Sequence, residues 1–91
     1  MYRVKLTATA AEMFTILHPD IKKQIRATLK TLYNAPYLGK ALQGELNHLR
    51  SLKMKRYRAI YQVNNENRTI IVYAIGHRKE IYEIVTELFY G

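Results

Sequence analysis

The hydrophobic pattern of this chain changes period near its middle, and that change limits the folds open to it. Apolar residues recur at helical spacing in the first third of the chain, whereas from His48 onward they alternate with polar residues. The alternation predicts three strands, at about His48–Met54, Tyr57–Asn64 and Thr69–Gly76. The asparagine-rich turn between the last two strands makes them a hairpin. The second half is therefore expected to form an antiparallel sheet.

The N-terminal part predicts one strand followed by two helices. Residues 2–6 alternate apolar and charged side chains, which is typical of a half-buried strand. Thr7 or Thr9 can cap a first helix, and His18-Pro19 ends it because a residue before proline avoids the helical region. Each helix has one apolar face, formed by Ala10, Met13, Phe14 and Leu17 in the first and by Ile21, Ile25, Leu29 and Leu32 in the second. The two helices are expected to form an antiparallel pair.

A third, C-terminal helix completes the expected order β-α-α-β-β-β-α. Its apolar stripe consists of Ile81, Ile84, Val85, Leu88 and Phe89. Residues 37–47, which contain Gly39 and Gly44, are expected to be a connecting loop. The fold class is α+β, in which a small, mostly antiparallel sheet packs on a helical hairpin as one pair of layers. The 91 residues are expected to form a single domain, residues 1–91.

Positive charge is concentrated in the second half of the chain. The chain has 15 Lys and Arg against 7 Asp and Glu, a formal charge of +8. The segment Leu46–Asn65 contains no acidic residue and five basic ones, namely Arg50, Lys53, Lys55, Arg56 and Arg58. Such an excess favours nucleic acid, an acidic protein or an anionic membrane as the partner. Because cations on adjacent strands can converge on one sheet face, RNA is the first expectation.

Several classes of site and location are excluded by composition. There is no Cys, so disulfides and thiolate metal sites are absent. The three His are isolated in the sequence, and we expect no metal site and no cofactor. The longest apolar run, Ile70–Ile75, is about a third of what a bilayer requires. The first six residues are too short and too charged for a secretory signal, so a cytoplasmic, soluble protein is expected.

Two segments resemble the RelE/ParE superfamily of bacterial and archaeal toxins. They are Leu52–Val63, which reads Leu-Lys-Met-Lys-Arg-Tyr-Arg-Ala-Ile-Tyr-Gln-Val, and Ala74–Arg78, which is followed by Tyr82. The resemblance covers nearly the whole chain as an architecture and is specific over about residues 46–82. RelE-like members of the superfamily cut mRNA in the ribosomal decoding site, whereas ParE-like members poison DNA gyrase. The resemblance also implies a cognate antitoxin as a partner.

The resemblance assigns catalytic roles to four residues. Arg58 matches the strand arginine after a tyrosine, and Arg78 matches the arginine after the glycine that ends the last strand. Tyr82 matches the tyrosine of the C-terminal helix, although its spacing from Arg78 is about two residues shorter than in the best-known RelE enzyme. Lys53 matches a basic residue of the preceding strand. Ser51 departs from the pattern because the best-known enzyme has a lysine there.

The remaining cations around this segment are expected to bind RNA. They are Arg50, Lys55, Arg56 and His77. Two outcomes are open for the missing lysine at position 51: either Arg50, Lys53 or Lys55 compensates for it, or the protein cleaves differently or more weakly. His77 has a second candidate role as a general acid, because the pKa of an ordinary imidazole lies near neutrality.

RNA cleavage without a metal suits these residue types. The 2′-hydroxyl attacks the adjacent phosphorus, a base removes its proton, and the leaving 5′-oxygen is protonated. Arg58 and Arg78 carry permanent charge on forks that match the non-bridging oxygens. The base is Tyr82 or a lysine, since clustered cations favour loss of a proton. Alternatives remain, because Tyr82 can stack on a base or belong to the core, and the two arginines can be surface ion-pair partners.

Three functions follow from these observations. The first is the toxin of a type II toxin–antitoxin system that acts as a ribosome-dependent mRNA endonuclease, with an antitoxin, the ribosome and mRNA as partners. The second is a ParE-like inhibitor of gyrase that has no nuclease activity. The third is a plain nucleic-acid-binding module. Because burial of an isolated charge is costly, Arg58 is expected on the open face of the sheet, together with Gln62 and Lys53.

Overall fold

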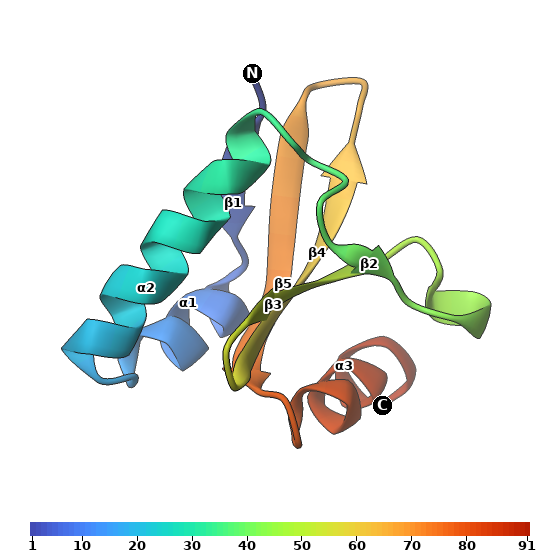
Figure 1. Cartoon of the computed structure of the whole chain (residues 1–91). Coiled ribbons are helices and arrows are strands. Elements are labelled where there is room, and N and C mark those ends of the chain that lie inside the picture. The colour runs from blue at the N-terminus through green and yellow to red at the C-terminus, as the bar shows by residue number, and fades with distance from the viewer.

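A five-stranded sheet runs through the middle of the molecule, with helices on both of its faces (Figure 1). The computed structural model describes all of residues 1–91. The strands lie in the order β1-β5-β4-β3-β2. Their bounds are β1 Arg3–Leu6, β2 Lys40–Ala41, β3 Arg50–Met54, β4 Tyr57–Asn64 and β5 Thr69–His77. β1 is parallel to β5 and the other neighbours are antiparallel, so the expected mostly antiparallel sheet is confirmed.

Three helices complete the fold, and local capping explains where the first two begin. They are α1 Ala8–Thr15, α2 Pro19–Lys30 and α3 Ile81–Tyr90. The Thr7 hydroxyl accepts a hydrogen bond from the Ala10 amide at 3.1 Å, and the His18 ring accepts one from the Asp20 amide at 3.1 Å. Thr7 is therefore the cap of α1. None of the three helices has the length and apolar character needed to cross a membrane.

The larger part of the core lies between the sheet and the pair α1 and α2. We call this side of the sheet the α1/α2 face. Its buried residues include Ala10, Ile25, Leu32, Leu52, Ala59, Tyr61, Ile70 and Val72. The apolar stripes expected for the first two helices supply the helical side of this layer. This layer is the sheet on a helical hairpin that the sequence predicts.

The second side of the sheet, the α3 face, is covered by α3 over part of its area (Figure 1). Leu49, Ile60 and Ala74 are buried there against Ile81 and Val85. The expectation of one pair of layers with an open second face is therefore wrong for this part of the sheet. The physical reason is that the middle of β4 is apolar on both faces and needs cover on both sides.

The short strand β2 falls in the segment expected to be a loop. It pairs antiparallel with β3, with Lys40 opposite Ser51 and Ala41 opposite Arg50. The buried Tyr61 hydroxyl positions the residues just before β2. It accepts a hydrogen bond from the Gly39 amide at 2.8 Å and donates one to the Pro36 carbonyl at 2.8 Å. A two-residue strand has no detectable alternation, so its sequence gives no strand signal.

Candidate functional site

Lys53 and Arg58 lie side by side across the β3–β4 pair. They are register partners, and Arg58 is also opposite Gly76 of β5. Paired residues of adjacent strands point to the same side of a sheet, and the alternation along β4 puts Arg58 and Gln62 on the α3 face with Ile60. The expected grouping of Arg58, Lys53 and Gln62 on one face is thus confirmed.

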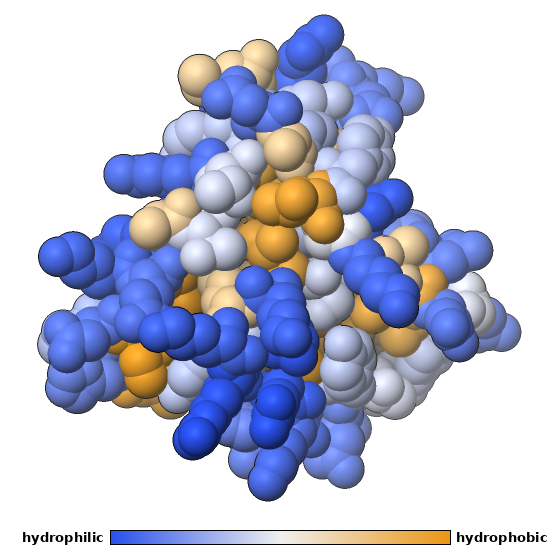
Figure 2. Space-filling view, viewed as in Figure 1, coloured by the Kyte–Doolittle hydropathy of each residue, from blue (hydrophilic) through white to orange (hydrophobic).

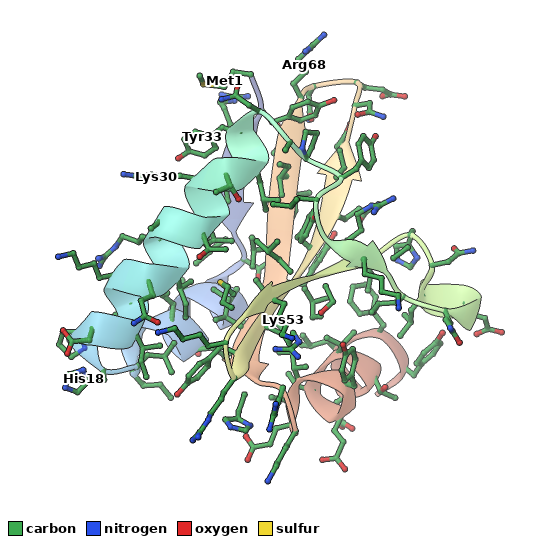
Figure 3. The ribbon with its side chains drawn as sticks, viewed as in Figure 1. Met1, His18, Lys30, Tyr33, Lys53 and Arg68 are labelled. Carbon is green, nitrogen blue, oxygen red and sulfur yellow. The ribbon has the colours of Figure 1, made fainter.

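Lys53 is exposed at the free edge of β3, beyond the end of β2. Figure 3 shows it on β3 between α2 and α3. It also borders a surface groove against α2, lined by Gln24, Ala27, Thr28, Lys53, Met54 and Lys55. Its ammonium group therefore has solvent on both sides of the strand edge and is free to reach a ligand there.

Arg58 is half-buried and held by main-chain carbonyls. Its Nη1 donates to the Lys55 carbonyl at 3.0 Å and to the Tyr57 carbonyl at 2.9 Å. Lys55 sits at the tight β3–β4 turn with a φ of 57°. The guanidinium has five N–H donors, so these two bonds orient the fork and leave further donors for an anion.

Arg78 lies in the connection between β5 and α3, and the backbone ties this connection to the β3–β4 turn. The Arg78 amide donates to the Arg56 carbonyl at 2.7 Å. Lys55, Arg56 and Arg78 are all exposed. We call Lys53, Lys55, Arg56, Arg58 and Arg78 the cationic patch, which occupies one end of the sheet.

The cationic patch is not neutralised by acidic side chains. The only side-chain ion pair in the protein joins His18 and Asp20, at 3.8 Å. The alternative in which Arg58 and Arg78 are surface ion-pair partners is therefore wrong. Figure 2 shows strongly hydrophilic residues gathered over the lower end of the molecule, below the end of β3. An exposed set of unpaired cations is suited to a polyanion.

Tyr82 lies in the first turn of α3 and faces Ser51 of β3. Its side chain is 47% exposed, which excludes the alternative that it belongs to the core. Its hydroxyl donates to the Ser51 Oγ at 3.4 Å. The two residues share a groove of about 350 Å³, which we call the Tyr82 groove; it is lined by Lys40, Ala41, Leu42, Gln43, Leu46, Ser51 and Tyr82.

Two residues expected to bind RNA do not join the cationic patch. Arg50 is opposite Tyr61, and its Nη1 donates to the Gly39 carbonyl at 2.6 Å while its guanidinium stacks on the Tyr37 ring. Arg50 is thus engaged in holding the segment before β2. His77 is opposite Tyr57 and its ring lies edge-on to that tyrosine, with centroids 5.8 Å apart. Its pairing with Tyr57 places it on the α1/α2 face, away from Arg58.

Sequence reasoning missed Lys40 and Gln43 in the Tyr82 groove. Both come from the segment that was expected to be a loop, so nothing in the hydrophobic pattern linked them to Ser51 or Tyr82. The structure contains no group of three or more His, Cys, Asp or Glu side chains that could hold a metal ion. What the site offers is fixed positive charge, one phenolic hydroxyl and lysine amines, which can bind a phosphodiester and move a proton.

Comparison with known proteins gives consistent matches. A family model described as the ParE toxin of the type II toxin–antitoxin system parDE matches residues 4–82. Toxin RelG of Mycobacterium tuberculosis is 30% identical over 83 residues, which cover 89% of this chain and 95% of that protein.

Solved structures show the same fold. The toxin–antitoxin complex RelBE2 of M. tuberculosis contains a chain that superposes with a TM-score of 0.78 at 29% identity, covering 85% of this chain and 98% of that one. The isolated E. coli RelE toxin superposes with a TM-score of 0.77 at 21% identity, covering 98% and 99%. At that lower identity the likeness to the E. coli toxin concerns the fold alone.

Proposed function

The chain belongs to the ParE toxin family of type II toxin–antitoxin systems, within the RelE/ParE superfamily, and from this premise we propose that it is a ribosome-dependent mRNA endonuclease. The single observation that carries the proposal is the cationic patch. It places Arg58 opposite Lys53, with Arg78 on the connection whose backbone bonds to Arg56, and no carboxylate forms an ion pair with any of the three. Several cations that lack carboxylate partners suit the closely spaced phosphates of an RNA strand.

The proposed reaction transfers the phosphoryl group within the RNA strand. The 2′-oxygen forms a bond to phosphorus, the bond from phosphorus to the 5′-oxygen breaks, and the products carry a 2′,3′-cyclic phosphate and a 5′-hydroxyl. Arg58 and Arg78 bind the non-bridging oxygens, where negative charge grows in the transition state. Tyr82 or Lys53 accepts the proton of the 2′-hydroxyl, and an acid returns a proton to the 5′-oxygen. These steps use only side chains and the substrate.

The openness of the site supports the proposed dependence on the ribosome. The cationic patch is exposed apart from the half-buried Arg58, and the Tyr82 hydroxyl bonds only to Ser51 at 3.4 Å. Such a site binds RNA but holds it loosely, so alignment of the 2′-hydroxyl with the scissile bond must come from elsewhere. Translating ribosomes present mRNA in a fixed geometry, and the protein is therefore proposed to act in the cytoplasm.

A cognate antitoxin is the proposed protein partner. RelBE2 of M. tuberculosis and the intact E. coli RelBE are toxin–antitoxin complexes, and their toxin folds match this chain. The formal charge of +8 favours a partner that is acidic or amphipathic. Exposed apolar residues of α3, including Leu88 at 45% and Tyr90 at 56% exposure, offer apolar contact area as well.

A second candidate is inhibition of DNA gyrase, because the matching family model is that of ParE toxins. Brief expression of the chain in growing cells separates the two functions. We expect primer extension to show new 5′ ends within translated messages and few in untranslated RNA. Intact messages together with gyrase-linked DNA breaks would favour the second candidate and contradict the first.

A further inference from the structure

Lys40 reaches the candidate site from a different strand than the other cations. It is the register partner of Ser51 across the β2–β3 pair, so both side chains leave the sheet on the same side with Cβ atoms about 5 Å apart. Both line the Tyr82 groove, where the Ser51 hydroxyl accepts the hydrogen bond of Tyr82. Lys40 is therefore brought to the reactive tyrosine by tertiary structure.

The backbone just before Lys40 is locked from both sides. The Gly39 amide donates to the Tyr61 hydroxyl at 2.8 Å, and the Gly39 carbonyl accepts from Arg50 at 2.6 Å. Gly39 is itself buried, and a Cβ there would approach the Tyr61 hydroxyl to 2.7 Å. A two-residue strand at a sheet edge is otherwise weakly held, so this anchoring keeps the Lys40 Cα in place.

The surroundings of Lys40 leave its charge uncompensated. Its ammonium group forms no ion pair, and none of the residues lining the Tyr82 groove is acidic. Glu45 of the neighbouring 3-10 turn, Gly44–Leu46, is not among them and instead accepts a hydrogen bond from Tyr90 at 3.0 Å. The groove is thus lined by one cation and one phenol.

We infer that Lys40 is an RNA-binding residue whose ammonium group contacts a backbone phosphate of the strand in the Tyr82 groove. The inference rests on the proposed function and extends it with a residue that sequence reasoning did not find. It also accounts for Ser51. A lysine at position 51 would direct its amine into the same groove, and in this chain the adjacent strand supplies that amine from position 40.

The inference is tested with five proteins and one RNA probe. The proteins are the wild type, Lys40→Ala, Lys40→Arg, the double variant Lys40→Ala/Ser51→Lys, and Lys23→Ala as a control that removes one exposed charge from α2. The probe is a labelled 2′-O-methyl RNA hexanucleotide, which cannot be cut because its 2′-oxygens are blocked. Binding is followed by anisotropy over a range of salt concentrations, and thermal melting verifies the fold.

The expected result is a loss of about tenfold in affinity for Lys40→Ala, with the slope of log affinity against log salt reduced by about one. Lys40→Arg and the double variant should recover most of the loss, because each returns a cation to the groove. Lys23→Ala should bind like the wild type. On ribosomes with mRNA, Lys40→Ala should lower the cleavage rate by a similar factor.

Two results would overturn the inference. One is wild-type affinity and salt slope in Lys40→Ala, and the other is a loss that neither Lys40→Arg nor Ser51→Lys restores. A wild-type protein that fails to cut mRNA on ribosomes would contradict the proposed nuclease function instead. The RNA-binding comparison would still decide the role of Lys40, because it requires no cleavage.

Discussion

The Arg58 guanidinium is held by hydrogen bonds and still has N–H donors free to bind an anion. Main-chain carbonyls at 2.9 and 3.0 Å orient its guanidinium, and no carboxylate competes for the positive charge. An arginine held in this way has little conformational freedom to lose when a phosphate binds. Arg78 has its backbone, rather than its side chain, tied to the β3–β4 turn. The two arginines thus present charge from the start of β4 and from the neighbouring β5–α3 connection.

We predict that Arg58→Ala and Arg78→Ala each lower the rate of mRNA cleavage by about 10²–10³-fold, as loss of one oxyanion-type donor does elsewhere. Neither change removes a core side chain, so the melting temperature should move little. Cleavage on purified ribosomes and thermal melting provide the measurements, with Lys23→Ala as the control for charge. Full activity in both arginine variants would show that the site lies elsewhere.

Tyr82→Phe separates the two roles left open for this tyrosine. The change keeps the ring for stacking on a base and removes only the hydroxyl that meets Ser51. We predict a smaller loss of cleavage rate than for either arginine variant, and an unchanged affinity for the uncleavable RNA probe. A loss as large as that of the arginine variants, measured at saturating ribosomes, would identify Tyr82 as the general base.

At the scale of elements, the site depends on a strand that sequence patterns do not reveal. The segment that leads into β2 is held by the Tyr61 hydroxyl, which is buried on the α1/α2 face, accepts a hydrogen bond from the Gly39 amide and donates one to the Pro36 carbonyl. Tyr61 is fully buried, with 0% of its surface exposed. That its hydroxyl would hold Pro36 and Gly39, more than 20 residues earlier in the chain, is known only from the three-dimensional structure. One buried hydroxyl therefore connects the core to the Tyr82 groove.

We predict that Tyr61→Phe lowers the free energy of unfolding by about 1–3 kcal/mol, because it leaves buried backbone groups without a partner. Urea denaturation measures this change. RNA affinity should also fall in this variant, since Lys40 loses its anchored backbone. A variant as stable as the wild type, with the same affinity, would contradict this role of the hydroxyl.

The same hydroxyl predicts a dependence of stability on alkaline pH. Burial raises the pKa of Tyr61 above its ordinary value of 10.0, and the Gly39 amide and Arg50 offset only part of this effect. The folded state therefore holds the phenolic proton more tightly than the unfolded state. This contribution to stability is complete below pH 10 and is lost as the pH rises through the folded-state pKa. Stability measured above pH 10 should fall more steeply in the wild type than in Tyr61→Phe.

The whole molecule divides into a part that could be predicted from its sequence and a part that could not. Alternation along residues 48–76 predicted the three long strands, and amphipathic stripes predicted the helices. The packing of α3 on the second sheet face was not predicted, although the consecutive apolar residues Ala59, Ile60 and Tyr61 indicate a strand buried on both faces. The positions of Lys40, Arg50 and His77 relative to the site could not be predicted, because strand register and tertiary hydrogen bonds determine them.

The charge of the whole chain bears on antitoxin binding. With a formal charge of +8, we predict that association with the protein encoded next to this gene is fast at low salt and slows by about tenfold or more at high salt. Stopped-flow mixing over a salt series measures the association rate constant. A rate constant insensitive to salt would indicate that apolar contacts with α3 guide the encounter instead.

Cleavage of mRNA at the cationic patch by attack of the 2′-hydroxyl can be tested with one substitution in the substrate. Purified ribosomes are programmed with an mRNA that carries a single 2′-deoxynucleotide at the position of cleavage, and the unmodified mRNA serves as the control. We predict a 2′,3′-cyclic phosphate end on the control and no cleavage of the modified message at that position. Cleavage of the modified message at the same position and rate would show that the 2′-hydroxyl is not the nucleophile.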